Sequence, residues 1–211
     1  MACFLGTPIL SKILYVTTFN RVLYKACAKH LIKSFLAHVE GDLLACYEED
    51  PAIPDDPRIM PVNIEKDPFL IQWLEDNKDI IPIAYGGENK KLKFKIGTID
   101  QFRYRASKWF RKIVALNRSL KYYDNYDAVV LLDADIVIKS SMVSSKVLEI
   151  FGDNDIIYHM GKYRRKQPVR GAAGVEAGIV GFKGQDGKEF LSRLINKFKD
   201  GTFRQYPRWD D

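Results

Sequence analysis

The sequence has few cysteines and histidines, with three of each among 211 residues. Cys3, Cys27 and Cys46 lack the paired spacing of a zinc site, and their odd number does not indicate a disulfide framework. We therefore interpret the three cysteines as small buried hydrophobic residues of a protein in a reducing compartment.

Long hydrophobic runs are also missing. No segment approaches the roughly 18 consecutive apolar residues of a membrane span. The apolar start of the chain lacks the basic residues that open a signal peptide, and Lys12 interrupts it. The sequence shows no internal repeat and no low-complexity segment. We therefore expect a soluble, cytoplasmic protein with no transmembrane segment.

The composition is that of a globular protein, with 46% apolar and 12% aromatic residues. The length is that of one sizeable α/β domain, so we expect a single domain over residues 1–211. The formal net charge of +6 favours anionic partners, which include phosphorylated ligands, nucleic acid and acidic membrane surfaces. The charge alone does not choose among these three classes.

The first fifty residues have the pattern of a βαβ unit, which implies a parallel sheet. Residues 12–20 and 42–50 are predicted strands that end in polar residues, and the helix expected between them covers residues 21–39. In such sheets, ligands bind beyond the carboxyl ends of the strands. This rule places the following residues on the ligand side: Thr17, Thr18, Asn20, Glu48, Glu49 and Asp50.

The rest of the sequence continues the α/β pattern. Four prolines within residues 51–63 predict an extended connection. Basic loops are expected at residues 86–95 and 162–174. Further strands are predicted at 80–85, 155–161 and 175–182, and helices at 69–77, 100–123, 144–151 and 188–199.

The most informative stretch is AVVLLDADIVI, residues 128–138, where Asp133 and Asp135 interrupt an apolar strand. A buried carboxylate is costly unless another group pairs with it. Either the chain turns here and both carboxylates reach solvent, or a cation holds them. Oxygen ligands suit Mg²⁺ and Mn²⁺, which keep open positions for phosphate oxygens. The pair is therefore a candidate site for a divalent cation that binds together with a nucleotide diphosphate.

Three other interpretations are open, two of the aspartate pair and one of the protein as a whole. In the simplest, the two aspartates form a solvated turn. In the second, Asp133 is the nucleophile and Asp135 the general acid of a haloacid-dehalogenase-like phosphatase. That motif normally lies on the first strand, whereas here a βαβ unit and a long helix precede it. In the third, interleaved basic and aromatic residues bind nucleic acid, but the two aspartates would repel phosphates without a metal.

Several weak motifs follow one another in an order that resembles GT-A-fold glycosyltransferases, over about residues 12–211. ILYVTTFN and CYEED resemble the first two strand ends, which seat the nucleoside, and LLDADIVI resembles the strand that carries the Asp-x-Asp motif. GVEAGIVGFKG resembles the segment that lines the donor-sugar and acceptor pocket. The helix FRYRASKWFRKIVAL and the ending YPRWDD are closest in style to phage- and virus-encoded members.

The resemblance implies a single α/β domain with a mainly parallel twisted sheet flanked by helices. It also implies sugar transfer from a nucleoside-diphosphate sugar, with a UDP-sugar as the expected donor, to a hydroxyl of a glycan or glycoprotein. A virus-encoded member would work in the host cytoplasm. The cofactor implied is Mn²⁺ or Mg²⁺, held by Asp135 with Asp133 as second ligand or ribose contact; Ala134 lies between them in the motif.

The resemblance also implies roles for single residues. Glu176 would orient the donor sugar or the acceptor. Asp211, or its neighbour Asp210, would act at the reacting centre, as a base in an inverting enzyme or a polar stabiliser in a retaining one. The alternatives without a functional role are that Glu176 is an edge-strand carboxylate that faces water, and that Asp210 and Asp211 belong to a frayed acidic terminus. The remaining assignments are to the nucleoside (Thr17, Thr18, Asn20, Glu49) and to the diphosphate (Lys108, Lys112), although a basic helix face is most often only solvated.

The sequence departs from the family pattern in two places. GT-A enzymes with a third metal ligand often take a histidine from late in the chain, and none follows His159. We interpret His159, which lies in an apolar strand, as a buried structural residue. Family members usually continue beyond the point where this sequence ends, which is consistent with a domain taken from a longer protein.

Overall fold

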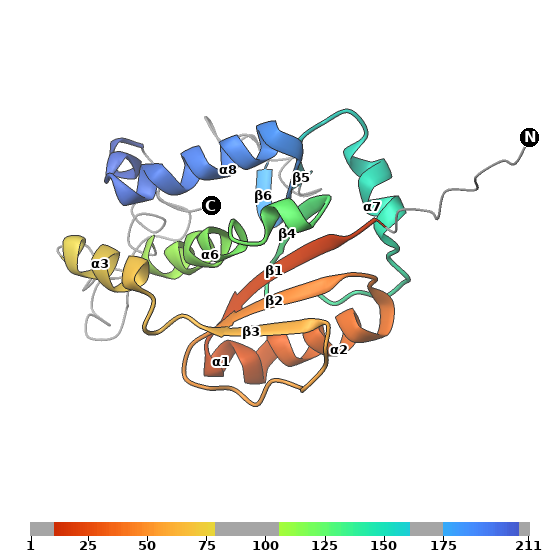
Figure 1. The fold of residues 1–211 in the computed structure, drawn as a ribbon. Helices are drawn as coiled ribbons and strands as arrows, with labels where there is room; N and C mark the ends of the chain where they lie inside the picture. The colour runs from red at the N-terminus through yellow and green to blue at the C-terminus, as the bar shows by residue number, and fades with distance from the viewer. Residues whose placement is uncertain (1–10, 79–105, 161–174, 207–211) are drawn as a thin grey trace, which may run out of the picture.

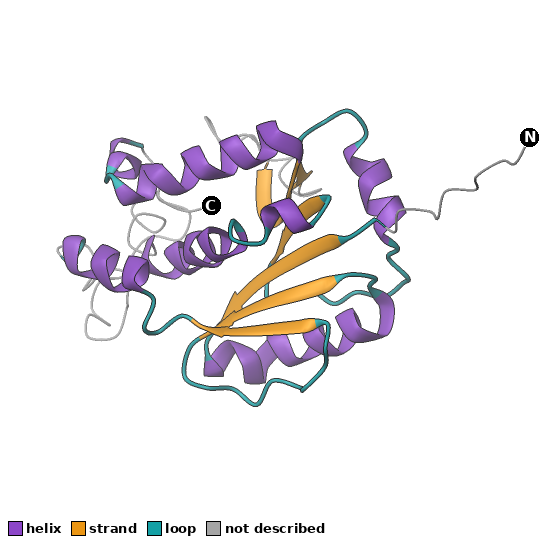
Figure 2. Cartoon of the chain, viewed as in Figure 1, coloured by secondary structure: helices purple, strands orange, loops and turns teal. Residues whose placement is uncertain are grey.

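The computed structural model of the chain describes residues 11–78, 106–160 and 175–206, without the side chains of 159–160 and 175–177. The described residues form a twisted sheet with helices on both faces (Figure 2). The predicted α/β class and mainly parallel sheet are confirmed.

The sheet has six strands in the order β3-β2-β1-β4-β6-β5. Four neighbouring strands are parallel, and β6 runs antiparallel to both β4 and β5. The strand bounds are β1 (Ile13–Phe19), β2 (Asp42–Tyr47), β3 (Ile59–Asn63), β4 (Ala128–Leu132), β5 (Ile156–Met160) and β6 (Val175–Lys183).

Helices cover the sheet in two groups (Figure 1). On one face lie α3 (Pro68–Asp76), α6 (Ala106–Ser119) and α8 (Gly184–Lys199), and on the other α2 (Lys29–His38) and α7 (Ser144–Phe151). The short elements are α1 (Arg21–Leu23), the π-helical η1 (Tyr24–Ala28), and two 3-10 helices, η2 (Tyr123–Asn125) and η4 (Thr202–Gln205). Among the described residues, no helix has the length and apolar character needed to cross a membrane.

The central strands are apolar on both sides because both sides are covered. In β1, Leu14 and Val16 pack toward α6, while Ile13 and Tyr15 pack toward α2. In β4, all five residues are buried. This alternation determines which polar residues at the strand ends share a face with α6.

An aromatic cluster attaches α6 to its neighbours. Trp73 of α3 stacks on Phe110 of α6 with ring centroids 4.0 Å apart, and Phe198 of α8 stacks on Phe203 at 5.1 Å. Aromatic rings contribute large buried areas. The cluster therefore holds α6 between α3 and α8, and α6 carries the basic residues of the candidate site.

Several sequence predictions need correction. The extended connection at 51–63 contains the edge strand β3, which tolerates Pro61 because an edge strand leaves some backbone groups unpaired. The strand predicted to continue over residues 136–138 ends at Leu132, where a turn begins. The last helix starts at Gly184, earlier than predicted. The elements predicted at 80–85, 86–95, 100–105 and 162–174 lie outside the described residues.

The first helix also differs from its prediction. A π-helical turn, η1, adds a residue to the register, so the buried face begins at Ala28 and continues through Leu31 and Phe35. Leu23 is therefore exposed, and the Cys27 side chain is partly exposed. The interpretation of Cys27 as buried was wrong, whereas that of Cys46 is confirmed. Cys3 lies outside the described residues.

Candidate active site

The polar residues that follow the parallel strands meet at one edge of the sheet. Thr18 at the end of β1 lies between Glu48, which follows β2, and Asp133, which follows β4. By strand alternation, Thr18 and Glu48 lie on the face that packs against α6, and the contacts of Asp133 place it there too. This row is the candidate site, and it matches the edge that the βαβ pattern predicted.

The chain turns directly after β4. The amide of Ile136 donates to the carbonyl of Asp133 (3.1 Å), and the amide of Asp133 donates to the carbonyl of Gly178 in β6 (2.9 Å). The turn leaves the Asp133 carboxylate 30% exposed and Asp135 exposed. Two aspartates thus interrupt an apolar run without a buried, unpaired charge, because the strand ends where they begin.

A cation of the protein holds the first aspartate. Lys112 Nζ lies 2.7 Å from Asp133 Oδ1, and its side chain is only 10% exposed. The same ammonium lies 4.7 Å from the centroid of the Trp109 ring, one turn earlier on α6. An ammonium between a carboxylate and an aromatic face is stabilised by both. Lys108, the other basic residue predicted to contact phosphate, is exposed.

The adjacent residue on α6 makes the second pair. Arg111 donates from Nε to Glu48 Oε2 (3.0 Å) and from Nη2 to Glu48 Oε1 (3.2 Å). Its Nη1 also donates to the carbonyl of Ser107. Both side chains of the pair are less than one-fifth exposed. A bidentate pair of this kind determines orientation as well as charge.

The backbone after β2 has a strained conformation. Glu49 and Asp50 have φ angles of 64° and 40°, and both side chains are exposed. Residues other than glycine rarely adopt this left-handed conformation, and such strain clusters at functional sites. The turn leaves Glu48 against Arg111 and exposes Glu49.

The three residues predicted at the end of β1 are placed differently. Thr18 is half-buried on the α6 face. Thr17 is completely buried, and its Oγ1 has no hydrogen-bond partner among the described residues. The Asn20 side chain accepts from the amide of Leu23 (2.9 Å) and so forms the N-cap of α1. Thr18 and Asn20 are thus partly exposed, whereas Thr17 is not accessible to a ligand in this structure.

A thiol lies close to the aspartates. Burial raises the pKa of Cys27, with smaller contributions from the negative charges of Asp135 and Asp133. Its Sγ contacts the carbonyl of Leu23 (3.2 Å). Cys27 belongs to η1, and single π-helical turns are frequent at functional sites.

Three predicted site residues remain without a described side chain. Glu176 lies in β6, opposite His159 of β5. Asp210 and Asp211 lie outside the described residues. Within the described part of the chain, no group of three or more His, Cys, Asp or Glu side chains forms a complete metal site. Asp133, Ala134 and Asp135 therefore provide at most two carboxylates of such a site.

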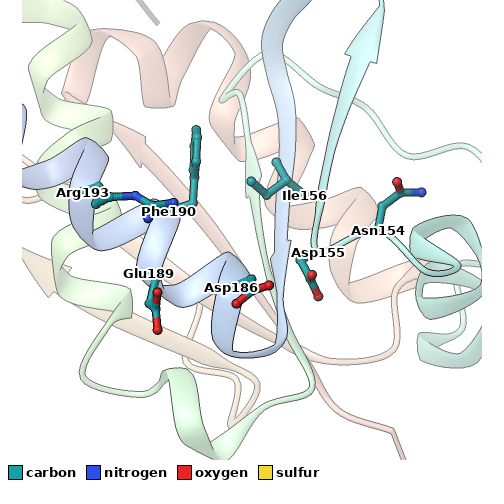
Figure 3. A pocket seen from close by; sticks show the side chains of 7 residues that line it. All are labelled: Asn154, Asp155, Ile156, Asp186, Glu189, Phe190 and Arg193. Atoms are coloured by element: carbon teal, nitrogen blue, oxygen red, sulfur yellow. The ribbon is translucent and has the colours of Figure 1, made fainter.

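A pocket lies at the opposite edge of the sheet, beside the start of β5 and the first turns of α8. Lys183, at the end of β6, donates from its amide to the carbonyl of Asp155 (2.8 Å) and pairs with Ala128 at the start of β4. Figure 3 shows Asp186 and Asp155 near each other in this pocket. Because the aspartates after β4 lie at the other end of that strand, this pocket is separate from the candidate site.

Two residues of the site, Arg111 and Trp109, were not predicted from the sequence. A helical spacing of basic residues pointed to Lys108 and Lys112, but it does not tell which side of the helix meets the sheet. Arg111 could have been found from Glu48, because a carboxylate at the end of a buried strand needs a hydrogen-bond partner.

Comparisons with known proteins bear on the fold. The sequence matches no protein-family model and no curated protein. Among solved structures, the galactosyltransferase LgtC, solved with donor and acceptor sugar analogues, has a TM-score of 0.52 at 15% identity, covering 92% of this chain and 64% of that one.

Two further structures are similar at lower scores. Mouse xyloside xylosyltransferase 1 has a TM-score of 0.48 at 12% identity, over 96% of this chain and 78% of that one. A glycosyltransferase involved in glycosylation of the major capsid of PBCV-1 has 0.45 at 9%, over 94% and 72%. The likeness to LgtC confirms the GT-A-type fold that the sequence resemblance implied.

Proposed function

We propose that this protein is a metal-dependent glycosyltransferase that moves a sugar from a nucleoside-diphosphate sugar, with UDP-sugar as the expected donor, to a hydroxyl of a glycan or glycoprotein. The observation that supports this most directly is the edge where Thr18 lies at the end of β1, between Glu48 after β2 and Asp133 after β4. Two cations of α6 lie against the two carboxylates. Two acid–base pairs thus lie at the edge where α/β sheets bind nucleotides.

The nucleoside would lie over the ends of β1 and β2. Thr18 and the exposed Glu49 are the side chains available to contact it. Thr17 and Asn20 would support the same loop, since one is buried beneath it and the other caps α1. The strained turn at Glu49 favours a binding role over a purely structural one.

The donor set at the end of β4 fits a hard divalent cation. Asp133 and Asp135 offer carboxylate oxygens, which Mn²⁺ and Mg²⁺ prefer, and the diphosphate of the donor would supply further oxygens. When bound, the cation supplies electrostatic stabilisation of the charge that develops on the departing diphosphate. Lys112 adds a positive charge beside the same phosphates, and Arg111 keeps Glu48 oriented.

The reacting groups belong to segments whose side chains the structure does not describe. We assign Glu176 to the donor sugar or acceptor, because β6 runs beside β4 and Gly178 lies against Asp133. Asp211, with Asp210 beside it, is assigned to the reacting centre.

The proposal is tested by calorimetric titration of UDP into the protein, with Mn²⁺ and then with a chelator, and again with GDP, CDP and dTDP. We expect binding that requires the metal and prefers one base. Asp135→Asn should abolish the metal dependence and leave the fold intact, because this carboxylate is exposed. Asp153→Asn is the matched control, since it removes an equally exposed aspartate near the other edge of the sheet.

The competing interpretations make different predictions. A phosphatase would hydrolyse a generic phosphate ester such as p-nitrophenyl phosphate and lose this activity in Asp133→Asn. A protein that binds no nucleotide with or without Mn²⁺, or an Asp135→Asn variant with undiminished metal dependence, would overturn the glycosyltransferase proposal.

A further inference from the structure

We infer that Lys112 is the resident cation of Asp133 in the ligand-free protein, and that it keeps a divalent cation off the Asp133–Asp135 pair until a nucleotide diphosphate arrives. The inference rests on the proposed function and adds its regulation, namely that cation and nucleotide bind together rather than independently. It concerns the position of one ammonium group, which the structure describes directly.

The ammonium is held where it blocks one side of the carboxylate. Lys112 Nζ lies 2.7 Å from Asp133 Oδ1 and 4.7 Å from the Trp109 ring centroid. Lys112 as a whole is 8% exposed on a helix whose next four residues are buried. A charged side chain with so little exposure to water depends on its partners. Asp133 is one of the partners that stabilise Lys112, and a new anion beside the ammonium would compete with it.

Asp133 also lies beside β6. Its amide donates to the carbonyl of Gly178 (2.9 Å), and a Cβ added at Gly178 would lie 3.6 Å from Asp133 Oδ2, whereas the glycine itself places no side-chain atom there. Asp135 is exposed, and among the described residues no ion pair or hydrogen bond involves its side chain. A metal ion that approaches without nucleotide would therefore meet one open carboxylate and one that already faces an ammonium.

The net charge of these side chains affects how strongly a metal ion binds before the nucleotide does. Lys112, Asp133 and Asp135 together carry one net negative charge, whereas the two carboxylates alone would carry two. Repulsion between the ammonium and a divalent cation at neighbouring positions weakens binding of the metal alone. A diphosphate offers the ammonium a further anion and gives the metal further oxygens. Each ligand thus raises the affinity of the other, and this coupling is reciprocal.

The test measures Mn²⁺ binding in the absence of nucleotide, from the electron paramagnetic resonance signal of free Mn²⁺. We expect weak binding to the wild-type protein and at least tenfold tighter binding to Lys112→Met. Lys112→Gln serves as a second neutral variant in case Met impairs folding. Lys112→Arg retains the positive charge, so its Mn²⁺ affinity should stay near that of the wild type. Thermal unfolding of each variant verifies the fold.

Lys121→Met is the matched control. Lys121 also lies above an aromatic ring, 5.7 Å from the centroid of Tyr122, but on the exposed turn that follows α6. Its removal should not change Mn²⁺ affinity. Equal Mn²⁺ affinities for wild type and both neutral variants would overturn the inference, as would an equal gain in Lys112→Arg.

The same series in the presence of UDP measures the coupling. UDP should raise Mn²⁺ affinity at least tenfold more in the wild type than in Lys112→Met. If UDP binds to neither protein, the proposed function fails, and the nucleotide-free titration still decides whether Lys112 keeps the cation away.

Discussion

Arg111 of α6 holds Glu48 at the end of β2 through two hydrogen bonds of 3.0 and 3.2 Å. The next residue of the helix, Lys112, pairs with Asp133 after β4. The two strands flank β1 on either side, so neighbouring residues of one helix determine the positions of two strand ends at the candidate site.

Removal of the Arg111 guanidinium should destabilise the fold. Arg111→Met should cost about 2 kcal/mol and Arg111→Lys about 1 kcal/mol, because a lysine cannot make the two parallel bonds. Urea-induced unfolding measures both costs. Arg21→Met, at an exposed arginine, should change stability by less than about 0.5 kcal/mol.

A double-mutant cycle with Glu48→Gln isolates the pair. Because the two side chains share their hydrogen bonds, the cost of the double variant should fall at least about 1 kcal/mol below the sum of the single costs. Additive costs would show that the two side chains act independently.

Substitution by alanine should affect stability at one glycine of β6 and ligand binding at another. At Gly181 a Cβ would lie 2.6 Å from Phe151 Cζ and 2.7 Å from Ile157 Cγ1, so Gly181→Ala should cost about 1–3 kcal/mol in unfolding free energy. At Gly178, among the described side chains, the same atom would meet only Asp133 Oδ2, at 3.6 Å. Gly178→Ala should therefore leave stability nearly unchanged and weaken Mn²⁺-dependent UDP binding, as calorimetry would show. Equal destabilisation by both variants would contradict this assignment.

The strained turn after β2 offers a way to separate stability from binding. Glu49→Gly removes the strain of a φ of 64°, and after the entropy cost of glycine it should stabilise the protein by about 0.5 kcal/mol. Glu49→Ala retains the strain and removes the same carboxylate. Both variants should lose affinity for the nucleotide equally, whereas only the glycine variant should gain stability in urea. A gain in both variants would locate the effect in the carboxylate rather than in the backbone.

Cys46 should make the protein sensitive to alkaline pH. Burial raises the pKa of this thiol from 9.0 to about 12. Between these values the unfolded chain releases a proton that the folded protein keeps, so the free energy of unfolding falls as pH rises. The thiol should contribute a loss of about 1 kcal/mol between pH 9 and pH 10.

Urea unfolding of wild type and Cys46→Ala over pH 7.5–10 measures this loss. The slope against pH should flatten in the variant, whatever its stability at neutral pH. Cys27→Ala serves as a comparison: the pKa of Cys27 is also raised by burial, so this variant should flatten the slope in the same direction but by less, because Cys27 is partly exposed. An unchanged slope in Cys46→Ala would assign the alkaline sensitivity to other groups, such as Tyr123 and Tyr126, whose pKa values are also raised, chiefly by burial.

The sequence alone was enough to predict a mainly parallel sheet and the edge at which its first strands end, although it did not predict the edge strand β3. Apolar residues alternate or run continuously where strands are buried, and the helix between the first two strands implies that they are parallel. The cost of a buried carboxylate indicated that the chain turns, or that a cation is present, at Asp133 and Asp135. The structure shows a turn at this point and a lysine ammonium beside Asp133.

Only the tertiary structure decided which charged groups meet. Arg111 and Glu48 are 63 residues apart in sequence, and no spacing rule joins them. The rotation of α6 about its axis determines which basic residues reach the strand ends, and this rotation depends on the aromatic packing around Phe110. The π-helical turn at Tyr24–Ala28 likewise shifts the register of the first helix and brings Cys27 toward the aspartates. Such contacts depend on long-range packing, which local sequence patterns do not encode.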